Sequence, residues 1–267
     1  MIYIFSILKE QFTHVGLIFR LALYDIKSKY QMHYLGVLWQ LFNPLVQVGV
    51  YWFVFGIGLR NGAPIGNTPY IVYLLLGLVP WFFVSPTIVQ GSNSIYSKVN
   101  LVSKMKFPVS ILPSITIISN AFNFVVMLII LVIILVLYDI NSGVYLLQLP
   151  YYMFCLLMFV FAFTLLSSTV SVLIRDFQLL IQSLMKMLFF LTPIFWSLDS
   201  FPKEFQRIIE LNPFTYLING FRDTFLGTGW FYKDLVYMFY FWSFTLVLLF
   251  IGSILHNNFK NKFVDYL

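Results

Sequence analysis

Charged residues are scarce in this sequence, and two long stretches contain none. No Asp, Glu, Lys or Arg occurs from residue 61 to 97 or from residue 107 to 138. Charged residues form 10% of the chain and hydrophobic residues form 60%, whereas typical soluble domains carry about 25% charged residues. These proportions exclude a soluble core, and the sequence predicts an all-α membrane protein that crosses the bilayer several times.

The sequence also lacks the short motifs of common enzyme sites. It contains no G-x-x-x-x-G-K-[S/T] phosphate loop, H-E-x-x-H, C-x-x-C or G-x-S-x-G. The single cysteine, Cys155, excludes an intrachain disulfide, and His14, His33 and His256 are widely separated. We therefore expect no catalytic residue, no metal site, no cofactor and no ATPase activity in this chain.

Acidic residues are absent from every predicted membrane span, and Lys186 is the only ionisable lysine within one. The lack of buried carboxylates disfavours an ion-coupled transporter, so the energy for any uphill transport must come from another protein. A lysine in the middle of a span costs about 2.5–3.5 kcal/mol. Lys186 is thus expected to reach back to the lipid headgroups, to pair with another group or to line a polar path.

Apolar runs and turn residues predict six transmembrane helices, with an amphipathic helix before them. The spans are 30–59 with the helix starting near Gly36, 69–91, 109–137, 149–174, 179–196 and 235–255. Pro80 and Pro86 should bend or break the second span unless neighbouring groups satisfy the freed carbonyls.

Two regions outside these spans have amphipathic character. Residues 1–30 carry apolar side chains at spacings of three or four, with charges between them. This pattern predicts an N-terminal interface helix, distinct from the six-span domain 31–267, although a plain basic anchor is an equal alternative. The long loop 198–233 predicts two short interfacial or re-entrant helices between spans five and six.

The distribution of charge predicts the orientation. With six spans both termini lie on one side, which holds ten Lys or Arg and four acids, whereas the other side holds five Lys or Arg and six acids. Basic residues collect on the cytoplasmic side of bacterial plasma membranes, so both termini are predicted to be cytoplasmic. The excess of positive charge thus reflects topology and does not indicate nucleic-acid binding.

A polar turn at 92–108 separates spans two and three and carries three lysines without an acid. We expect this turn to contact a cytoplasmic partner, although its lysines alone would also serve to fix the topology. The candidate contact residues are Lys98, Asn100, Lys104, Lys106, Phe107 and Pro108. In the N-terminal segment, Arg20, Lys27 and Lys29 could attract an anionic lipid-linked headgroup or ordinary anionic lipid.

Aromatic residues make up 20% of the chain. Those within or at the ends of spans one, two and five could form a face along which sugar rings slide by apolar contact, although ordinary helix packing would also explain each one. The candidate channel aromatics are Trp39, Tyr51, Trp81, Phe82, Phe189, Phe190 and Trp196.

Several short segments occur together in a characteristic order along nearly the whole chain. They include Leu35-Gly36-Val37-Leu38-Trp39 with Asn43-Pro44, Gly77-Leu78-Val79-Pro80-Trp81, Asn100-Leu101-Val102-Ser103-Lys104 with Phe107-Pro108, Thr192-Pro193-Ile194-Phe195 and Asn212-Pro213-Phe214. In this set the chain resembles the membrane subunits of ABC exporters for teichoic acid, O-antigen and capsule polysaccharide. The short ending Phe263-Val264-Asp265-Tyr266-Leu267 is most similar to the wall teichoic acid branch.

The resemblance implies a homodimer of this chain with two copies of a separate ATPase subunit, which would bind ATP and Mg. It implies that the turn 92–108 is a coupling helix seated on the ATPase, that the N-terminal helix guides a lipid-linked substrate, and that 198–233 forms an external gate. The expected function is export of lipid-linked wall teichoic acid across the plasma membrane. The alternatives are export of O-antigen or capsule polysaccharide, export of a drug or small lipid, and a membrane-embedded transferase.

Overall fold

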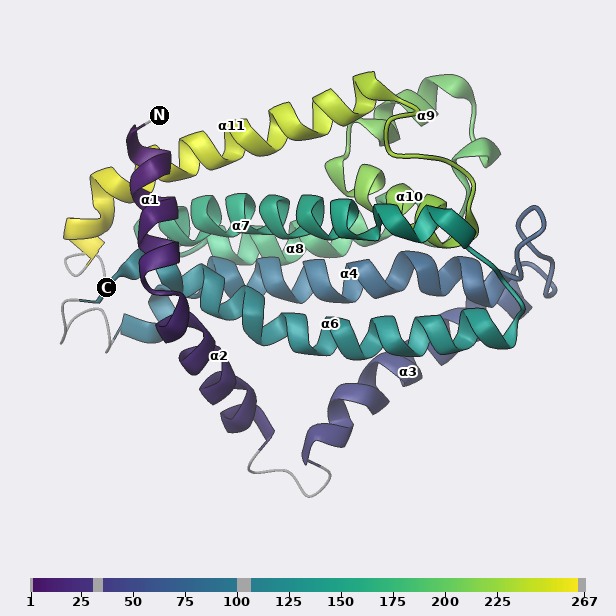
Figure 1. The fold of residues 1–267 in the computed structure, drawn as a ribbon, viewed down its shortest axis with the longest axis horizontal. Coiled ribbons are helices and arrows are strands. Elements are labelled where there is room, and N and C mark those ends of the chain that lie inside the picture. Colours follow the sequence, from purple (N-terminus) through teal and green to yellow (C-terminus); the bar gives the residue numbers. More distant parts are fainter. Residues whose placement is uncertain (1, 31–35, 100–106, 264–267) are drawn as a thin grey trace.

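The computed structural model describes residues 2–30, 36–99 and 107–263, and in these residues it is helical apart from turns and one isolated β-bridge between Ile65 and Thr68. Four segments are long and apolar enough to cross a membrane. They are α4 (Tyr70–Ser92), Val109–Leu137 with α6 (Leu112–Leu137), Gly143–Leu173 with α7 (Leu149–Leu173), and α11 (Leu235–Phe259). Figure 1 shows α4, α6 and α7 side by side along the molecule, with α11 against α7.

Helix α4 is the centre of the bundle. It packs against α6 and α7, and also against α8 (Phe177–Leu191) and α10 (Pro213–Leu226). Of its most apolar window 78% is buried, against 28% for those of α6 and α11. A helix that is apolar on all sides is stable only when neighbours surround it. This packing accounts for the continuity of α4, which runs through Pro80 and Pro86 without the expected break.

The predicted first span is helical from the expected start near Gly36 to Gly58. It consists of a short 3₁₀ helix (Gly36–Leu38), α3 (Trp39–Tyr51) and a π-helical segment (Trp52–Gly58), and residues 31–35 lie outside the described part of the chain. The predicted fifth span is shorter than expected. The fifth, α8, ends at Leu191 rather than Trp196 because Pro193 forces Thr192 into an extended conformation. Six spans of full length are therefore not confirmed: four helices meet the length, and two shorter apolar helices accompany them.

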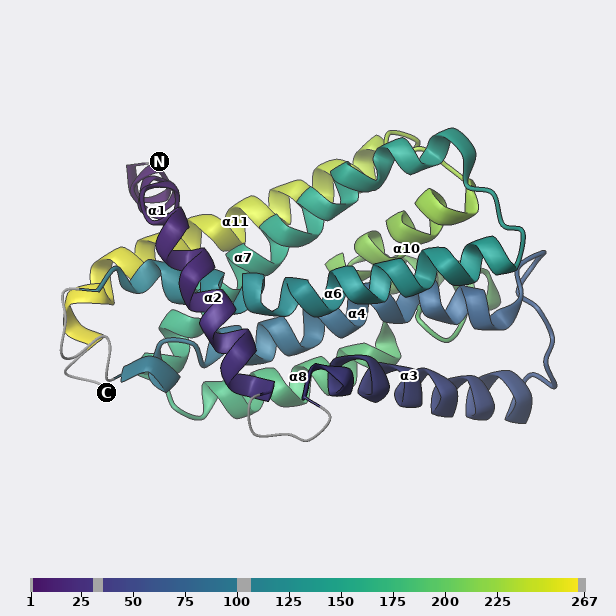
Figure 2. The same ribbon diagram turned by 60° about the horizontal axis from the view of Figure 1, so that its bottom comes forward.

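The N-terminal segment forms two helices instead of one, α1 (Ile2–Thr13) and α2 (Val15–Tyr30). They cross the end of the bundle where both termini lie, which we call the terminal end (Figures 1 and 2). Helix α1 packs on α11, and α2 packs on α6. Ile7, Ile18 and Ala22 are buried against the bundle, whereas Phe5 and Phe12 are exposed as expected for a lipid-facing side.

Two helices lie between α8 and α11 within the loop 198–233, at the opposite end of the bundle (Figure 1), while their interfacial or re-entrant placement in a membrane stays a prediction. Helix α9 (Lys203–Glu210) is mostly exposed, whereas α10 is largely buried. The side chain of Asn212 caps α10 by accepting a hydrogen bond from the Phe214 N–H at 3.1 Å. Gly227 ends α10 with a left-handed φ of 67°, which glycine adopts without strain.

Candidate functional site

A groove of about 530 Å³ lies between α3, α4 and α8. The three helices meet here because α3 and α8 both pack on α4. The lining residues are Asn43, Pro44, Gln47, Tyr51, Trp81, Phe82, Ser85, Pro86, Val89, Gln90, Gln182, Met185, Lys186 and Phe189. The groove therefore lies where the two shorter apolar helices face the central helix of the bundle.

The lining changes in character along the groove. Amide side chains come from the parts of the helices nearer the terminal end, where α3 and α8 begin and α4 finishes; these are Asn43, Gln47, Gln90 and Gln182. Aromatic rings occupy the part nearer the opposite end, where the ring centroid of Phe189 lies 5.4 Å from that of Tyr51 and 5.6 Å from that of Trp81. A molecule in the groove would meet hydrogen-bonding groups at one end and apolar ring faces at the other.

The groove contains four of the seven aromatic residues that the sequence suggested for a channel, Tyr51, Trp81, Phe82 and Phe189. The other three are not among its lining residues. Trp39 is exposed at the start of α3, and Phe190 is exposed beside Phe189. Trp196 lies beyond the end of α8, where its ring packs on Phe201 at 4.7 Å.

Lys186 also lines the groove, and its side chain is exposed. It is the only Lys, Arg, Asp, Glu or His among the lining residues. Within the described part of the chain it makes no hydrogen bond or ion pair. The groove brings Lys186 together with the amide of Gln182, while the choice among the three explanations for this lysine stays a prediction.

A short non-helical segment follows Leu191, the last residue of α8. Side chains from α4 and α10 donate to four consecutive carbonyls of this segment. The Arg222 guanidinium donates to Pro193 O at 2.5 Å and to Ile194 O at 2.9 Å. The hydroxyls of Tyr70 and Tyr73 donate to Phe195 O at 3.2 Å and Trp196 O at 3.1 Å. The carbonyls of this segment have no partner within a helix, and these four hydrogen bonds satisfy them.

Arg222 is the central residue of this arrangement. Its side chain is only 6% exposed, and its guanidinium carbon lies 3.6 Å from the ring centroid of Tyr73. Burial lowers the pKa of Arg222 to about 10, so it remains a cation at neutral pH and gains from the aromatic face. The sequence analysis did not identify this site; the available signal was an arginine between Phe221 and Phe225 in a segment rich in aromatic residues.

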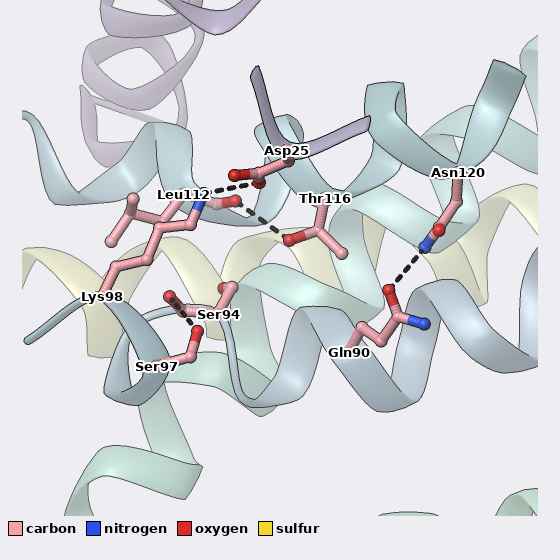
Figure 3. A network of polar contacts seen from close by, with 8 residues as sticks. All are labelled: Asp25, Gln90, Ser94, Ser97, Lys98, Leu112, Thr116 and Asn120. Atoms are coloured by element: carbon pink, nitrogen blue, oxygen red, sulfur yellow. Dashed lines mark hydrogen bonds and ion pairs between the residues drawn. The ribbon is translucent and has the colours of Figure 1, made fainter. Parts of the chain in front are cut away.

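The predicted coupling residues lie partly within the described structure. The Lys98 ammonium pairs with the Asp25 carboxylate of α2 at 2.7 Å (Figure 3). Phe107 and Pro108 are half-buried before the turn Val109–Ile111. Asn100, Lys104 and Lys106 lie outside the described residues.

Further contacts join α1 to the start of α6. The Ser110 hydroxyl donates to the Glu10 carboxylate at 2.7 Å, and the Ser114 hydroxyl donates to Gln11 at 2.8 Å. Together with the Asp25–Lys98 pair, these bonds connect the N-terminal helices to both sides of the turn 92–108. A displacement of the turn would therefore be transmitted to α1 and α2.

The predicted headgroup residues all belong to α2. Arg20 and Lys27 are exposed, and Lys29 is in the last turn of the helix. Near this helix, a polar cavity of about 350 Å³ is lined by Asp25, Lys98, Ser119 and Gln178 among others, and it shares Val89 and Gln90 with the groove. Figure 3 shows Gln90 in this region, where its side-chain oxygen accepts from Asn120 at 3.3 Å.

Comparison with known families identifies the chain. The family model described as ABC-2 type transporter matches residues 17–226. The chain belongs to this family. It is thus a multi-pass membrane protein of the ABC-2 type, and the groove, the turn and the N-terminal helices lie within or beside the matched region.

Proteins named for export or transport of a polysaccharide are similar to this chain. The O-antigen export system permease protein RfbA of Myxococcus xanthus is 27% identical over 221 residues, covering 82% of this chain and 84% of the relative. RfbA of Klebsiella pneumoniae is 26% identical over 244 residues, covering 91% and 92%. The polysialic acid transport protein KpsM of Escherichia coli is 27% identical over 241 residues, covering 88% and 90%.

Proposed function

We propose that this ABC-2 permease carries a lipid-linked cell-surface polysaccharide across the bacterial plasma membrane, and that the groove between α3, α4 and α8 is its path. The observation that supports this proposal is the change of lining from amides to aromatic rings along the groove. Amides exchange hydrogen bonds with sugar hydroxyls, while the apolar faces of sugar rings are desolvated against aromatic rings. Neither half provides a single tight site, which suits a polymer that must keep moving.

The kind of polymer follows from the relatives. Their names refer to O-antigen and polysialic acid, so a polysaccharide of this kind is the preferred substrate. Wall teichoic acid, which the short C-terminal ending suggested, is the second candidate. Phe263 of that ending is buried and packs against His256 at 5.5 Å, and residues 264–267 lie outside the described part.

The complex we propose contains two copies of this chain and two copies of an ABC ATPase, which binds ATP and Mg. Asn43, Gln47 and Lys186 line the groove yet are exposed in the single chain, so a second copy would complete the enclosure. The turn 92–108 would contact the ATPase with the termini on the cytoplasmic side. Arg20, Lys27 and Lys29 would face the lipid-linked headgroup, and α9 and α10 would form the external gate.

The test replaces groove aromatics while keeping their apolar volume. We expect the triple variant Tyr51→Leu, Phe82→Leu, Phe189→Leu to lower surface polymer in a strain lacking the native gene by about tenfold, because each ring loses its flat stacking face. Surface polymer is measured by immunoblotting of whole cells, and membrane insertion is measured in parallel. The matched control is Phe250→Leu on the exposed side of α11. Wild-type levels of surface polymer from a normally inserted triple variant would contradict the groove as the path.

A further inference from the structure

Lys186 is a cation for which the groove offers no counter-ion. It lies one turn beyond Gln182 on α8, and both side chains line the groove. No Asp or Glu is among the lining residues, and the ion pair that the described structure contains nearby, Asp25–Lys98, already joins the acid of α2 to another lysine. The groove therefore carries a formal positive charge that no lining residue in the described part of the chain balances.

The position of Lys186 along α8 makes lipid headgroups a poor partner. It is nine residues beyond Phe177, or about 14 Å along the helix axis at 1.5 Å per residue. A lysine side chain reaches back over only part of that distance. An ionisable residue at such a depth is stable when it faces a watery path or a partner of opposite charge.

A second copy of the chain would not supply that partner. The six predicted spans contain no Asp or Glu, and Asp176 precedes the first residue of α8. Gln182 lies one turn before Lys186 on α8, and Gln47 of α3 lines the same groove; each neutral amide can donate two hydrogen bonds. One ammonium with amide donors beside it is a set of groups suited to a carboxylate or phosphate oxygen.

We propose that Lys186, with the amides of Gln47 and Gln182, binds an anionic group carried by the sugar units of the exported polymer. This inference rests on the proposed function and narrows it to an acidic polymer bearing carboxylates or phosphates. A lysine is a flexible point charge without the two-pronged geometry of arginine. It attracts each passing negative charge yet releases it, as a transport path requires.

The test measures binding to the full-length chain in nanodiscs of zwitterionic lipid. The probes are a fluorescent oligomer of sialic acid and a fluorescent oligomer of mannose, followed by anisotropy at low ionic strength. We expect Lys186→Gln to weaken sialic acid binding by about 10- to 100-fold, the range for a hydrogen bond to a charged group. Mannose binding should not change, and Lys186→Arg should retain most of the affinity for sialic acid.

Lys262→Gln, at an exposed position in the short helix Lys260–Lys262, is the matched control and should bind both probes like the wild type. An equal loss of both probes in Lys186→Gln would overturn the inference, because the lysine would then only shape the groove. Unchanged sialic acid binding in that variant would overturn it as well. If phosphatidylglycerol in the nanodisc abolishes sialic acid binding by the wild type, the occupant is a lipid headgroup and the inference is wrong.

The same measurement separates this inference from the proposed function. Wild-type protein that binds neither oligosaccharide would overturn the groove as a sugar path, and the inference with it. Wild-type protein that binds both probes, with no effect of Lys186→Gln, would overturn the inference alone.

Discussion

Arg222 shows how one side chain can stabilise an interrupted helix inside a membrane protein. Its two terminal nitrogens bind the carbonyls of Pro193 and Ile194, and its planar face lies on the ring of Tyr73. A lysine has no fixed fork with which to hold two carbonyls at once. The segment after α8 is therefore held in place by a residue that is distant in sequence and specific in shape.

Removing this arginine should destabilise the fold at the end of α8. We expect Arg222→Gln to lower the free energy of unfolding by about 2–4 kcal/mol, because buried carbonyls lose their donors. Arg222→Lys should fall between this variant and the wild type. Thermal unfolding of the purified chain in detergent measures the effect. The control is Arg207→Gln on exposed α9, which should stay within about 0.5 kcal/mol of wild type. Equal stability of the two glutamine variants would contradict the role assigned to Arg222.

At the scale of elements, α10 and α7 approach each other closely at a glycine. A Cβ added to Gly220 of α10 would be 1.9 Å from the Tyr152 ring of α7, far inside van der Waals contact. Tyr152 is itself buried in the contact between the two helices. Small residues permit such close approach where helices pack within a membrane.

Gly220→Ala should therefore separate α10 from α7 and reduce stability by at least about 1–3 kcal/mol, the usual cost of overpacking. The measurement is again the unfolding midpoint, together with the yield of monodisperse protein. In a double-mutant cycle, Gly220→Ala should cost less in a Tyr152→Ala background than in the wild type. Gly49→Ala in α3 meets nothing within 4 Å and should be neutral or slightly stabilising. A harmless Gly220→Ala would show that α10 is not seated against α7.

The elements that the sequence predicted well are those with one dominant signal. Long apolar runs located α4, α6, α7 and α11. The early end of α8 was missed because the apolar run continues past Pro193, and only the tertiary bonds from Arg222 show how that break is stabilised. The continuity of α4 through two prolines depends likewise on neighbours that sequence patterns do not reveal.

The residues that share the groove were likewise predicted only in part from the sequence. Tyr51, Trp81, Phe82 and Phe189 share the groove because they lie at related depths on helices that pack together. Trp39 was grouped with them on residue type alone, although it lies at the first residue of α3 and outside the lining. The pairing of Lys98 with Asp25 spans 73 residues and has no signature in the sequence.

At the scale of the whole molecule, we propose that the turn 92–108 receives the force that an ABC ATPase exerts. Lys98 is joined to α2, so its substitution should disturb the N-terminal helices directly. Lys104 and Lys106 lie in the same turn, and we expect the variant Lys104→Glu, Lys106→Glu to reduce co-purification of an ABC ATPase by about tenfold or more, because charges of opposite sign across an interface favour association. The measurement is pull-down of the tagged chain from cells that express the neighbouring ATPase gene.

The control for this experiment measures the orientation of the variant in the membrane. Ser97→Cys and Asn67→Cys, each in a Cys155→Ala background, report opposite ends of the bundle, and both native side chains are exposed. A membrane-impermeant maleimide should label Asn67→Cys in spheroplasts and Ser97→Cys only after permeabilisation. Full recovery of the ATPase with a correctly oriented double glutamate variant would mean that these lysines serve topology only.

The contact between α1 and α11 has a consequence for the biogenesis of the chain. Helix α1 is translated long before α11, on which it packs, and Ile7 of α1 is buried in the finished bundle. During synthesis α1 can already meet Ser110 and Ser114 at the start of α6, but its contact with α11 forms only after α11 has been made. Insertion of the nascent chain and the docking of α1 on α11 are thus separate events.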